Sequence, residues 1–330
     1  MFGYPKQSCL HLPTPVSYLP NLSDRLGIEF YMKRDDLTEF GVGGNKLRKL
    51  EYLIYDAKEK GATMLITVGG AQTNHGRLTA AVAAKNQMKC AIVAMDDYPG
   101  ILSSNMLLDR IFGAYVFLHK PDGTPLMDVV EQVAEKFESQ GERCYFIPMG
   151  GSNEIGALGY YECAQELKQE FKSGHVIVPL GSMGTYMGLF CGLHDSDLTL
   201  TGVQIMPYEE DIYKYACNYF DKIKKSWKLD FADISAGADE KRELDRIRKN
   251  VGLMNAEKIY GYLKKTKESE IDWLEKIFRR DDHSFWYPET KNRNDVIQVK
   301  SGQVNQNREV MFSNIARAVE AGCEKDSGGS

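Results

Sequence analysis

The fold of this chain is indicated most clearly by residues 64–85, which read MLITVGGAQTNHGRLTAAVAAK. The apolar run Met64–Val68 is continuous rather than alternating, as expected of a strand that is covered on both faces of a sheet. Two glycines follow this run, and Arg77–Lys85 then has the composition of a helix. A strand, a glycine turn and a helix in this order form the unit from which parallel α/β sheets are built.

The region up to about residue 206 repeats this alternation. Its pattern predicts seven strands: Ile28–Lys33, Thr63–Val68, Lys89–Met95, Tyr115–Leu118, Arg143–Ile147, His175–Leu180 and Thr199–Met206. Helices are predicted between them over Lys46–Lys60, from Thr124-Pro125 to Gly141, over Ala157–Phe171 and over Tyr186–Leu193. We therefore expect an α/β fold with parallel sheets flanked by helices.

The composition changes after residue 206. Glycine becomes scarce, and long charged segments take the place of the short apolar runs. Helices are predicted over Glu209–Lys225, Asp239–Lys249, Ala256–Arg280 and Arg308–Glu320, with a short strand at Gln298–Lys300.

The overall composition is that of a globular protein. The 330 residues are 43% hydrophobic and 26% charged, and a net charge of −5 gives no reason to expect nucleic acid or an anionic membrane as a partner. The seven cysteines are scattered and form no C-x-x-C pair, so we expect reduced thiols and no metal site. Because the first residues resemble no signal peptide and no apolar run could span a bilayer, the expected location is the cytoplasm.

The first chemical feature is the lysine in residues 43–51, which read GGNKLRKLE. Two glycines before Lys46 allow a sharp turn and a close approach of the backbone to a ligand. Lys46 then begins a predicted helix, where the positive end of the helix dipole favours the neutral amine that attacks an aldehyde. Taken alone, the segment favours the simpler interpretation, which is an exposed lysine at a helix start.

Two further loops follow predicted strands. After Val68 come Thr73 and Asn74, which could position a carboxylate and donate to a phenolate oxygen, and then His75. After Leu180, the residues Gly181, Ser182, Met183, Gly184 and Thr185 offer consecutive backbone N–H groups at a helix start, an arrangement that binds phosphate. A reactive lysine, a donor to a ring oxygen and a phosphate cradle are together the anchors that pyridoxal 5'-phosphate requires.

Four segments resemble the D-cysteine desulfhydrase and 1-aminocyclopropane-1-carboxylate deaminase family of fold-type-II pyridoxal-phosphate enzymes. They are KRDDLTEFGVGGNKLRKLEYL, LITVGGAQTNHGRLTAAVAAK, GGSNEIGALGYYECAQEL and VPLGSMGTYMGL, and the resemblance covers roughly residues 10–205.

By this resemblance Lys46 carries the cofactor covalently, Asn74 contacts its ring oxygen and residues 181–185 hold its phosphate. Thr73 is expected beside the substrate as a catalytic and binding residue, with Asn74 and His75 also near the substrate. His75 matches the desulfhydrase pattern, whereas the deaminases usually have glutamine there. The implied reaction is β-elimination from a small amino acid, with D-cysteine giving pyruvate, ammonia and sulfide.

The alternatives are 1-aminocyclopropane-1-carboxylate deaminase, another amino-acid ammonia-lyase, or a cofactor-binding protein with impaired catalysis. Impaired catalysis is an alternative because the region after residue 206 departs from the family, which has a catalytic tyrosine and a partner for the pyridine nitrogen there. The resemblance further implies a homodimer with a two-domain architecture like that of the tryptophan synthase β subunit. The small domain would span residues 47–155, and the large domain would combine 1–46 with 156–330.

Overall fold

The computed structural model describes residues 4–95, 102, 104–119, 123–205, 208 and 211–227. The chain divides into two compact units. One comprises residues 1–13 and 39–256, and the other comprises residues 14–38 and 257–330. The expected boundaries of the two domains, at residues 46/47 and 155/156, stay a prediction.

In the second unit, the described residues form a small hairpin with one helix. Strand β1 (Val16–Tyr18) pairs antiparallel with β2 (Tyr31–Lys33), and α1 (Pro20–Leu26) lies between them in sequence. Strand β1 was not predicted, because three residues are too few for a pattern. The predicted strand Ile28–Lys33 is shorter than expected and begins only at Tyr31.

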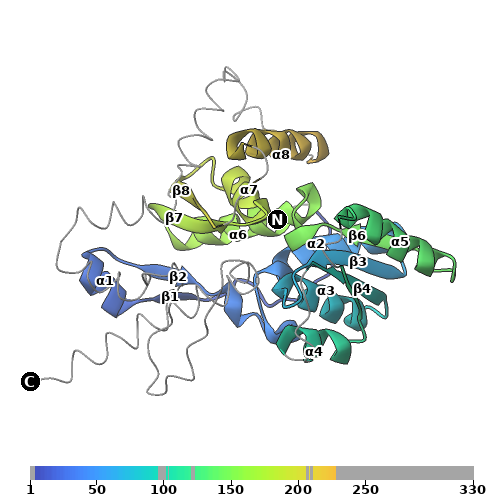
Figure 1. The fold of residues 1–330 in the computed structure, drawn as a ribbon. Coiled ribbons are helices and arrows are strands. Elements are labelled where there is room, and N and C mark those ends of the chain that lie inside the picture. The colour runs from blue at the N-terminus through green and yellow to red at the C-terminus, as the bar shows by residue number, and fades with distance from the viewer. Residues whose placement is uncertain are drawn as a thin grey trace, which may run out of the picture. The chain divides into compact units, whose positions relative to one another are not determined.

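The first unit contains a four-stranded parallel sheet, shown in Figure 1, with the strand order β5-β4-β3-β6. Its strands are β3 (Met64–Gly69), β4 (Lys89–Ala94), β5 (Tyr115–Leu118) and β6 (Cys144–Ile147). All six residues of the central strand β3 are buried. This agrees with its continuous apolar sequence, because a strand covered on both faces has no polar side.

Helices cover both faces of this sheet. On one face, α2 (Lys46–Glu59) and α3 (Asn74–Lys85) pack through their apolar residues into one core. On the other face, α5 (Leu126–Glu138) contributes Val130, Val133 and Phe137 to a second apolar core. Helix α4 (Ser104–Ile111) packs beside α3. The turn after β3 therefore lies at the carboxyl edge of a parallel sheet, where ligands bind in this class of fold.

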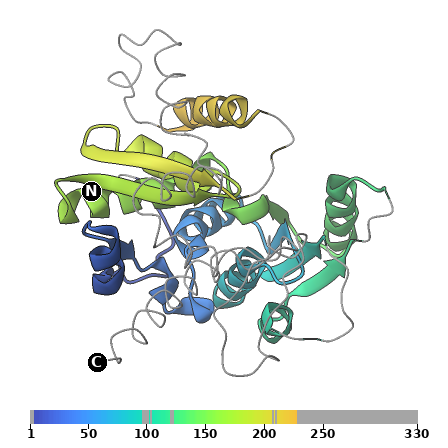
Figure 2. The same cartoon turned by 60° about the vertical axis from the view of Figure 1, so that its left-hand side comes forward.

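A parallel pair of strands follows later in the same unit. β7 (Ser173–Leu180) and β8 (Asp197–Gln204) lie side by side in Figures 1 and 2. They pack with α6 (Glu154–Glu170), α7 (Gly184–Gly192) and α8 (Ile212–Ser226) around one apolar core.

Most predicted elements are confirmed, with differences at their ends. Helix α6 begins three residues before the predicted Ala157, because the side chain of Asn153 accepts a hydrogen bond from the Gly156 N–H at 2.8 Å and caps the helix. The predicted helix from Glu209 corresponds to α8. The other elements predicted beyond residue 227 lie outside the described residues. Among the residues that are described, no helix has the length and apolar character needed to cross a membrane.

Candidate active site

Lys46 is the first residue of α2 and follows a turn that only glycine adopts easily. Gly43 and Gly44 have φ angles of 74° and 135°, in the region that disfavours residues with a Cβ. The Lys46 side chain is half-buried, and its Nζ donates to the Asn45 Oδ1 at 2.9 Å. Its Cε lies 3.6 Å from the position that a Cβ on Gly150 would take. The turn thus directs Lys46 toward the loop that contains Gly150.

The 181–185 turn approaches the same point. A Cβ on Gly150 would also collide with the Ser182 Oγ, and Gly150 itself has a φ of 67°. Lys46 and Ser182 therefore both approach the point that a side chain on this residue would occupy, and the glycine keeps that point free. The structure brings together the lysine and the phosphate loop that the sequence assigned to one cavity.

Lys49, one helical turn after Lys46, was not predicted as a site residue. Its side chain is 1% exposed, and its Nζ donates to the Gly150 carbonyl and to the Ser152 Oγ, both at 3.2 Å. It lies 3.0 Å from the position of a Cβ on Gly184. The spacing of three residues from Lys46 was a usable signal, because residues i and i+3 share one side of a helix.

Hydroxyl groups complete a polar cradle around Lys49. The Oγ atoms of Ser152 and Ser182 are 2.6 Å apart, and the Gly184 N–H donates to the Ser152 Oγ at 3.3 Å. A Cβ on Gly184 would lie 2.6 Å from the Ser152 Oγ and fill this space. An ammonium group, two hydroxyls and a backbone N–H at the start of α7 form a donor set suited to a phosphate.

The remaining residues of the phosphate loop hold it in place. Met183 is buried with a φ of 64°, an uncommon conformation for a residue with a side chain. Thr185 is half-buried in the first turn of α7. The Gly181 carbonyl accepts a hydrogen bond from the Tyr208 hydroxyl.

The loop after β3 places its side chains by hydrogen bonds. Thr73 is the N-cap of α3, where its Oγ1 accepts from the Gly76 N–H at 3.4 Å. The Oδ1 of the half-buried Asn74 accepts from the Asn105 Nδ2 at 2.8 Å and from the Arg77 Nη2 at 3.4 Å. Asn105 was not predicted, since nothing in the local sequence connects it with Asn74.

Arg77 links this loop to the turn before Lys46. Its guanidinium donates to the carbonyl of Gly41 and, at 2.9 Å, to that of Gly43. The same group reaches Asn74, so one buried arginine sets the relative positions of the asparagine loop and the lysine turn.

His75 is turned into the protein rather than toward an open surface. The side chain is 3% exposed, and its Nε2 is 2.8 Å from the Thr67 Oγ1 on β3. Burial and then the positive charges of Lys46 and Lys49 lower its pKa to about 3. His75 is therefore a neutral imidazole near both lysines, and its predicted contact with substrate stays a prediction.

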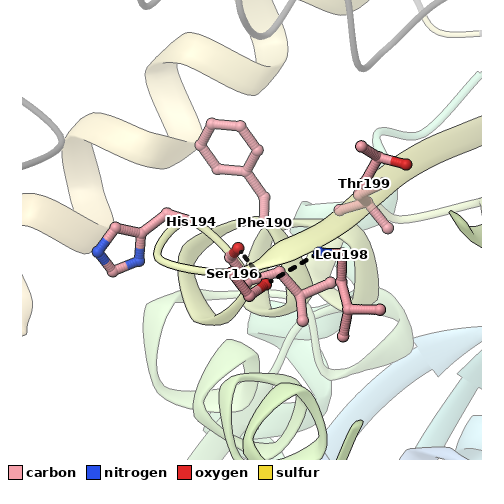
Figure 3. A pocket seen from close by; sticks show the side chains of 7 residues that line it. Phe190, His194, Ser196, Leu198 and Thr199 are labelled. Atoms are coloured by element: carbon pink, nitrogen blue, oxygen red, sulfur yellow. Dashed lines mark hydrogen bonds between the residues drawn. The ribbon is translucent and has the colours of Figure 1, made fainter. Parts of the chain in front are cut away.

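A separate hollow lies between the end of α7 and the start of β8 (Figure 3). This cavity of about 160 Å³ is lined by Phe190, Leu193, His194, Ser196, Leu198, Thr199 and Leu200. Its lining includes no lysine, and the His194 Nδ1 is engaged by the Cys191 carbonyl at 2.7 Å. We therefore place the candidate active site at Lys46 and Lys49 and not at this cavity.

An α/β fold with an accessible lysine beside a buried phosphate-type cradle defines a class of enzymes that act through a phosphorylated aldehyde. Residues 9–261 match the family model described as "Pyridoxal-phosphate dependent enzyme". The chain belongs to this family, and pyridoxal 5'-phosphate is its cofactor.

Individual relatives agree with this assignment. A Pyrococcus abyssi protein named for 1-aminocyclopropane-1-carboxylate deaminase is 33% identical over 76% of this chain and 81% of its own length. A D-cysteine desulfhydrase of Klebsiella pneumoniae (strain 342) is 42% identical over 63% of each chain. The match thus spans less than two thirds of that desulfhydrase.

Among solved structures, an ACC deaminase homologue has a TM-score of 0.63 and 36% identity, with coverage of 68% of this chain and 70% of that one. The expected fold class, the α/β fold of type II pyridoxal-phosphate enzymes, is confirmed.

Proposed function

We propose that this chain catalyses β-elimination from a small amino acid, with D-cysteine and water giving pyruvate, ammonia and hydrogen sulfide. The observation that carries the proposal is the placement of both lysines at the Gly150 turn, with the Lys46 Cε 3.6 Å from the position of a Cβ on Gly150 and Lys49 bound to the Gly150 carbonyl and Ser152. One lysine is thereby available for chemistry while the other supplies charge to bind an anion.

The described residues fit the cofactor at both ends. Lys49, Ser152, Ser182 and the Gly184 N–H would hold its phosphate, because together they offer a cation and short donors around a space kept free of side chains. Lys46, whose Cε also lies near Gly150, would hold the aldehyde carbon. When bound, the cofactor supplies an electron-withdrawing ring that stabilises negative charge at the substrate α-carbon.

The protein groups then divide the remaining tasks. Lys46 would hold the aldehyde of the cofactor, and its Nζ would accept the α-proton of the substrate as general base. Asn74 donates from its amide to the ring oxygen, and Thr73 lies beside the substrate. His75 would lie near the substrate, and its Cε1 lies 3.5 Å from the position of a Cβ on Gly151.

A second candidate function is 1-aminocyclopropane-1-carboxylate deaminase. It is favoured by the Pyrococcus abyssi relative, of which this chain covers a larger share than of the desulfhydrases. The identity of residue 75 as histidine favours the desulfhydrase, because the deaminases usually have glutamine there. The remaining candidate functions are another amino-acid ammonia-lyase activity and cofactor binding with impaired catalysis.

The test is an assay of the purified full chain with pyridoxal phosphate. Release of sulfide from D-cysteine supports the desulfhydrase, whereas 2-oxobutyrate from 1-aminocyclopropane-1-carboxylate supports the deaminase. A visible absorption band without either product, and without turnover of L-serine or L-cysteine, would overturn both in favour of a binding protein.

We also propose a cytoplasmic homodimer. The proposal rests on the family resemblance and on the six described cysteines, which are free thiols. Light scattering of the purified chain at micromolar concentration tests the dimer, and a monomeric mass would contradict it.

A further inference from the structure

Asn105 joins the start of α4 to the loop after β3 by three hydrogen bonds. Its side-chain Nδ2 donates to the Gln72 carbonyl and to the Asn74 Oδ1, both at 2.8 Å. Its backbone N–H donates to the Gln72 Oε1 at 2.9 Å. Asn105 is therefore bound to the residue that would contact the cofactor ring, but it belongs to a different element.

The direction of these bonds follows from the groups at their ends. A guanidinium can only donate, so the Asn74 atom that faces Arg77 must be its oxygen. A main-chain carbonyl can only accept, so the Asn105 atom that faces Gln72 must be its nitrogen. The orientations of both amides are thereby assigned by groups that cannot exchange roles.

The arrangement leaves one group of Asn74 available. Its Oδ1 accepts from Asn105 and Arg77, whereas its Nδ2 has no hydrogen-bond partner among the described residues. A half-buried amide nitrogen without a partner can donate to an acceptor that enters the site.

We propose that Asn105 is a positioning residue that orients Asn74 so that the Asn74 Nδ2 donates to the ring oxygen of the cofactor. The inference rests on the proposed function, in which Asn74 contacts that oxygen. Asn105 itself does not touch the cofactor and acts only through Asn74. Because a donor stabilises an anionic oxygen, loss of this orientation raises the pH at which the oxygen loses its proton.

The experiment uses the full chain with pyridoxal phosphate and measures the pH midpoint of its visible absorption band, together with the cofactor Kd. Asn105→Asp and Asn105→Ala are each made in the wild type and in Asn74→Ala. We expect both to raise the midpoint by about 1 pH unit and to weaken cofactor binding about tenfold in the wild-type background.

The relative size of the midpoint shifts in Asn105→Asp and Asn105→Ala distinguishes an orienting role of Asn105 from a packing role. Aspartate has the size of asparagine but cannot donate, and its carboxylate repels the Asn74 Oδ1 and turns the amide around. The aspartate variant should therefore shift the midpoint at least as far as alanine, whereas a packing role predicts the opposite order. In the Asn74→Ala background both shifts should be mostly lost, because the two residues act as one unit.

Each other outcome counts against the inference. A wild-type band with an unchanged midpoint in both Asn105 variants would overturn it, and so would equal shifts with and without Asn74. If the wild type forms no visible band, the proposed function fails and takes this inference with it. Thermal unfolding of each variant checks its fold, and the alanine variant decides the matter if the aspartate variant does not fold.

Discussion

The two strand–loop–helix turns of the candidate site are built by different means. The loop after β3 has side chains held by directional hydrogen bonds, in which Asn105 and Arg77 donate to the Asn74 Oδ1. The loop after β7 uses a backbone N–H, small hydroxyls and a charge brought from α2 by Lys49. The difference suits the two ends of one ligand, since a ring oxygen requires a donor in one direction and a phosphate accepts donors from several.

Lys46 lies near the loop after β7, and its replacement should have the largest effect. Under the proposed function, Lys46→Ala removes the amine that would carry the cofactor and accept the α-proton, so sulfide release from D-cysteine should fall below detection. Because the side chain is half-buried rather than buried, the unfolding temperature should change little. A variant that retains turnover within tenfold of the wild type would contradict this role.

The charge of the phosphate-side cradle is tested by Lys49→Met. Loss of a charge-assisted bond should weaken cofactor binding about 10- to 100-fold, measured by fluorescence titration. The matched control is Lys58→Met on the same helix, where the exposed Nζ donates to the Gln7 Oε1 at 3.0 Å and no change in affinity is expected. Equal affinities in the two variants would show that the cradle needs no cation from α2.

The space between the lysine and the phosphate loop is tested by Gly150→Ala. The left-handed backbone at this position is unfavourable for alanine, and the added Cβ would collide with Ser182. We therefore expect the free energy of unfolding to fall by about 3 kcal/mol. The matched control is Gly141→Ala, because Gly141 has a φ of 90° but no atom within 4 Å of its Cβ position. This variant has the unfavourable backbone alone, and its free energy of unfolding should fall by about 1 kcal/mol. The comparison fails if both lose the same amount in urea unfolding.

The buried imidazole beneath the asparagine loop predicts a pH dependence of stability. The pKa of His75 is about 3 in the folded protein and about 6.5 when unfolded, so the unfolded state binds the proton first as the pH falls. Protonation of His75 in the unfolded state therefore costs little stability above pH 6.5. Below pH 6.5 the free energy of unfolding declines, by about 2 kcal/mol between pH 7 and pH 5.

The variant His75→Gln should lack this decline. Unfolding in urea at pH 7, 6 and 5 therefore measures the difference between wild type and variant, which cancels the other titrating groups. A difference that stays constant with pH would mean that the imidazole is already accessible to protons in the folded protein.

The sequence predicted the parts of this site that are local in the chain. The apolar strands, the glycine turns and Lys46 at a helix start each follow from neighbouring residues, and they occur where expected. The contributions of Lys49, Ser152 and Asn105 depend on contacts between residues 31 to 103 positions apart. Such contacts follow from the packing of helices on the sheet, which local patterns do not encode.

His75 shows a second limit of local patterns. The family resemblance places it near the substrate, and in the structure its ring contacts Thr67 on β3, so its contact with substrate stays a prediction. A side chain in a loop can point toward the ligand or toward the strand beneath it, and only the three-dimensional structure distinguishes the two. Most of the region after residue 206, where the family has its catalytic tyrosine, lies outside the described residues.

The division of labour between the two lysines can be tested directly by chemical reduction. The purified chain is incubated with pyridoxal phosphate, treated with borohydride to fix the cofactor on its lysine, digested and mapped by mass spectrometry. We predict a pyridoxyl group on Lys46 and none on Lys49. Labelling of Lys49 with Lys46 unmodified, or of exposed lysines without preference, would contradict the assignment of the aldehyde to one lysine and the phosphate to the other.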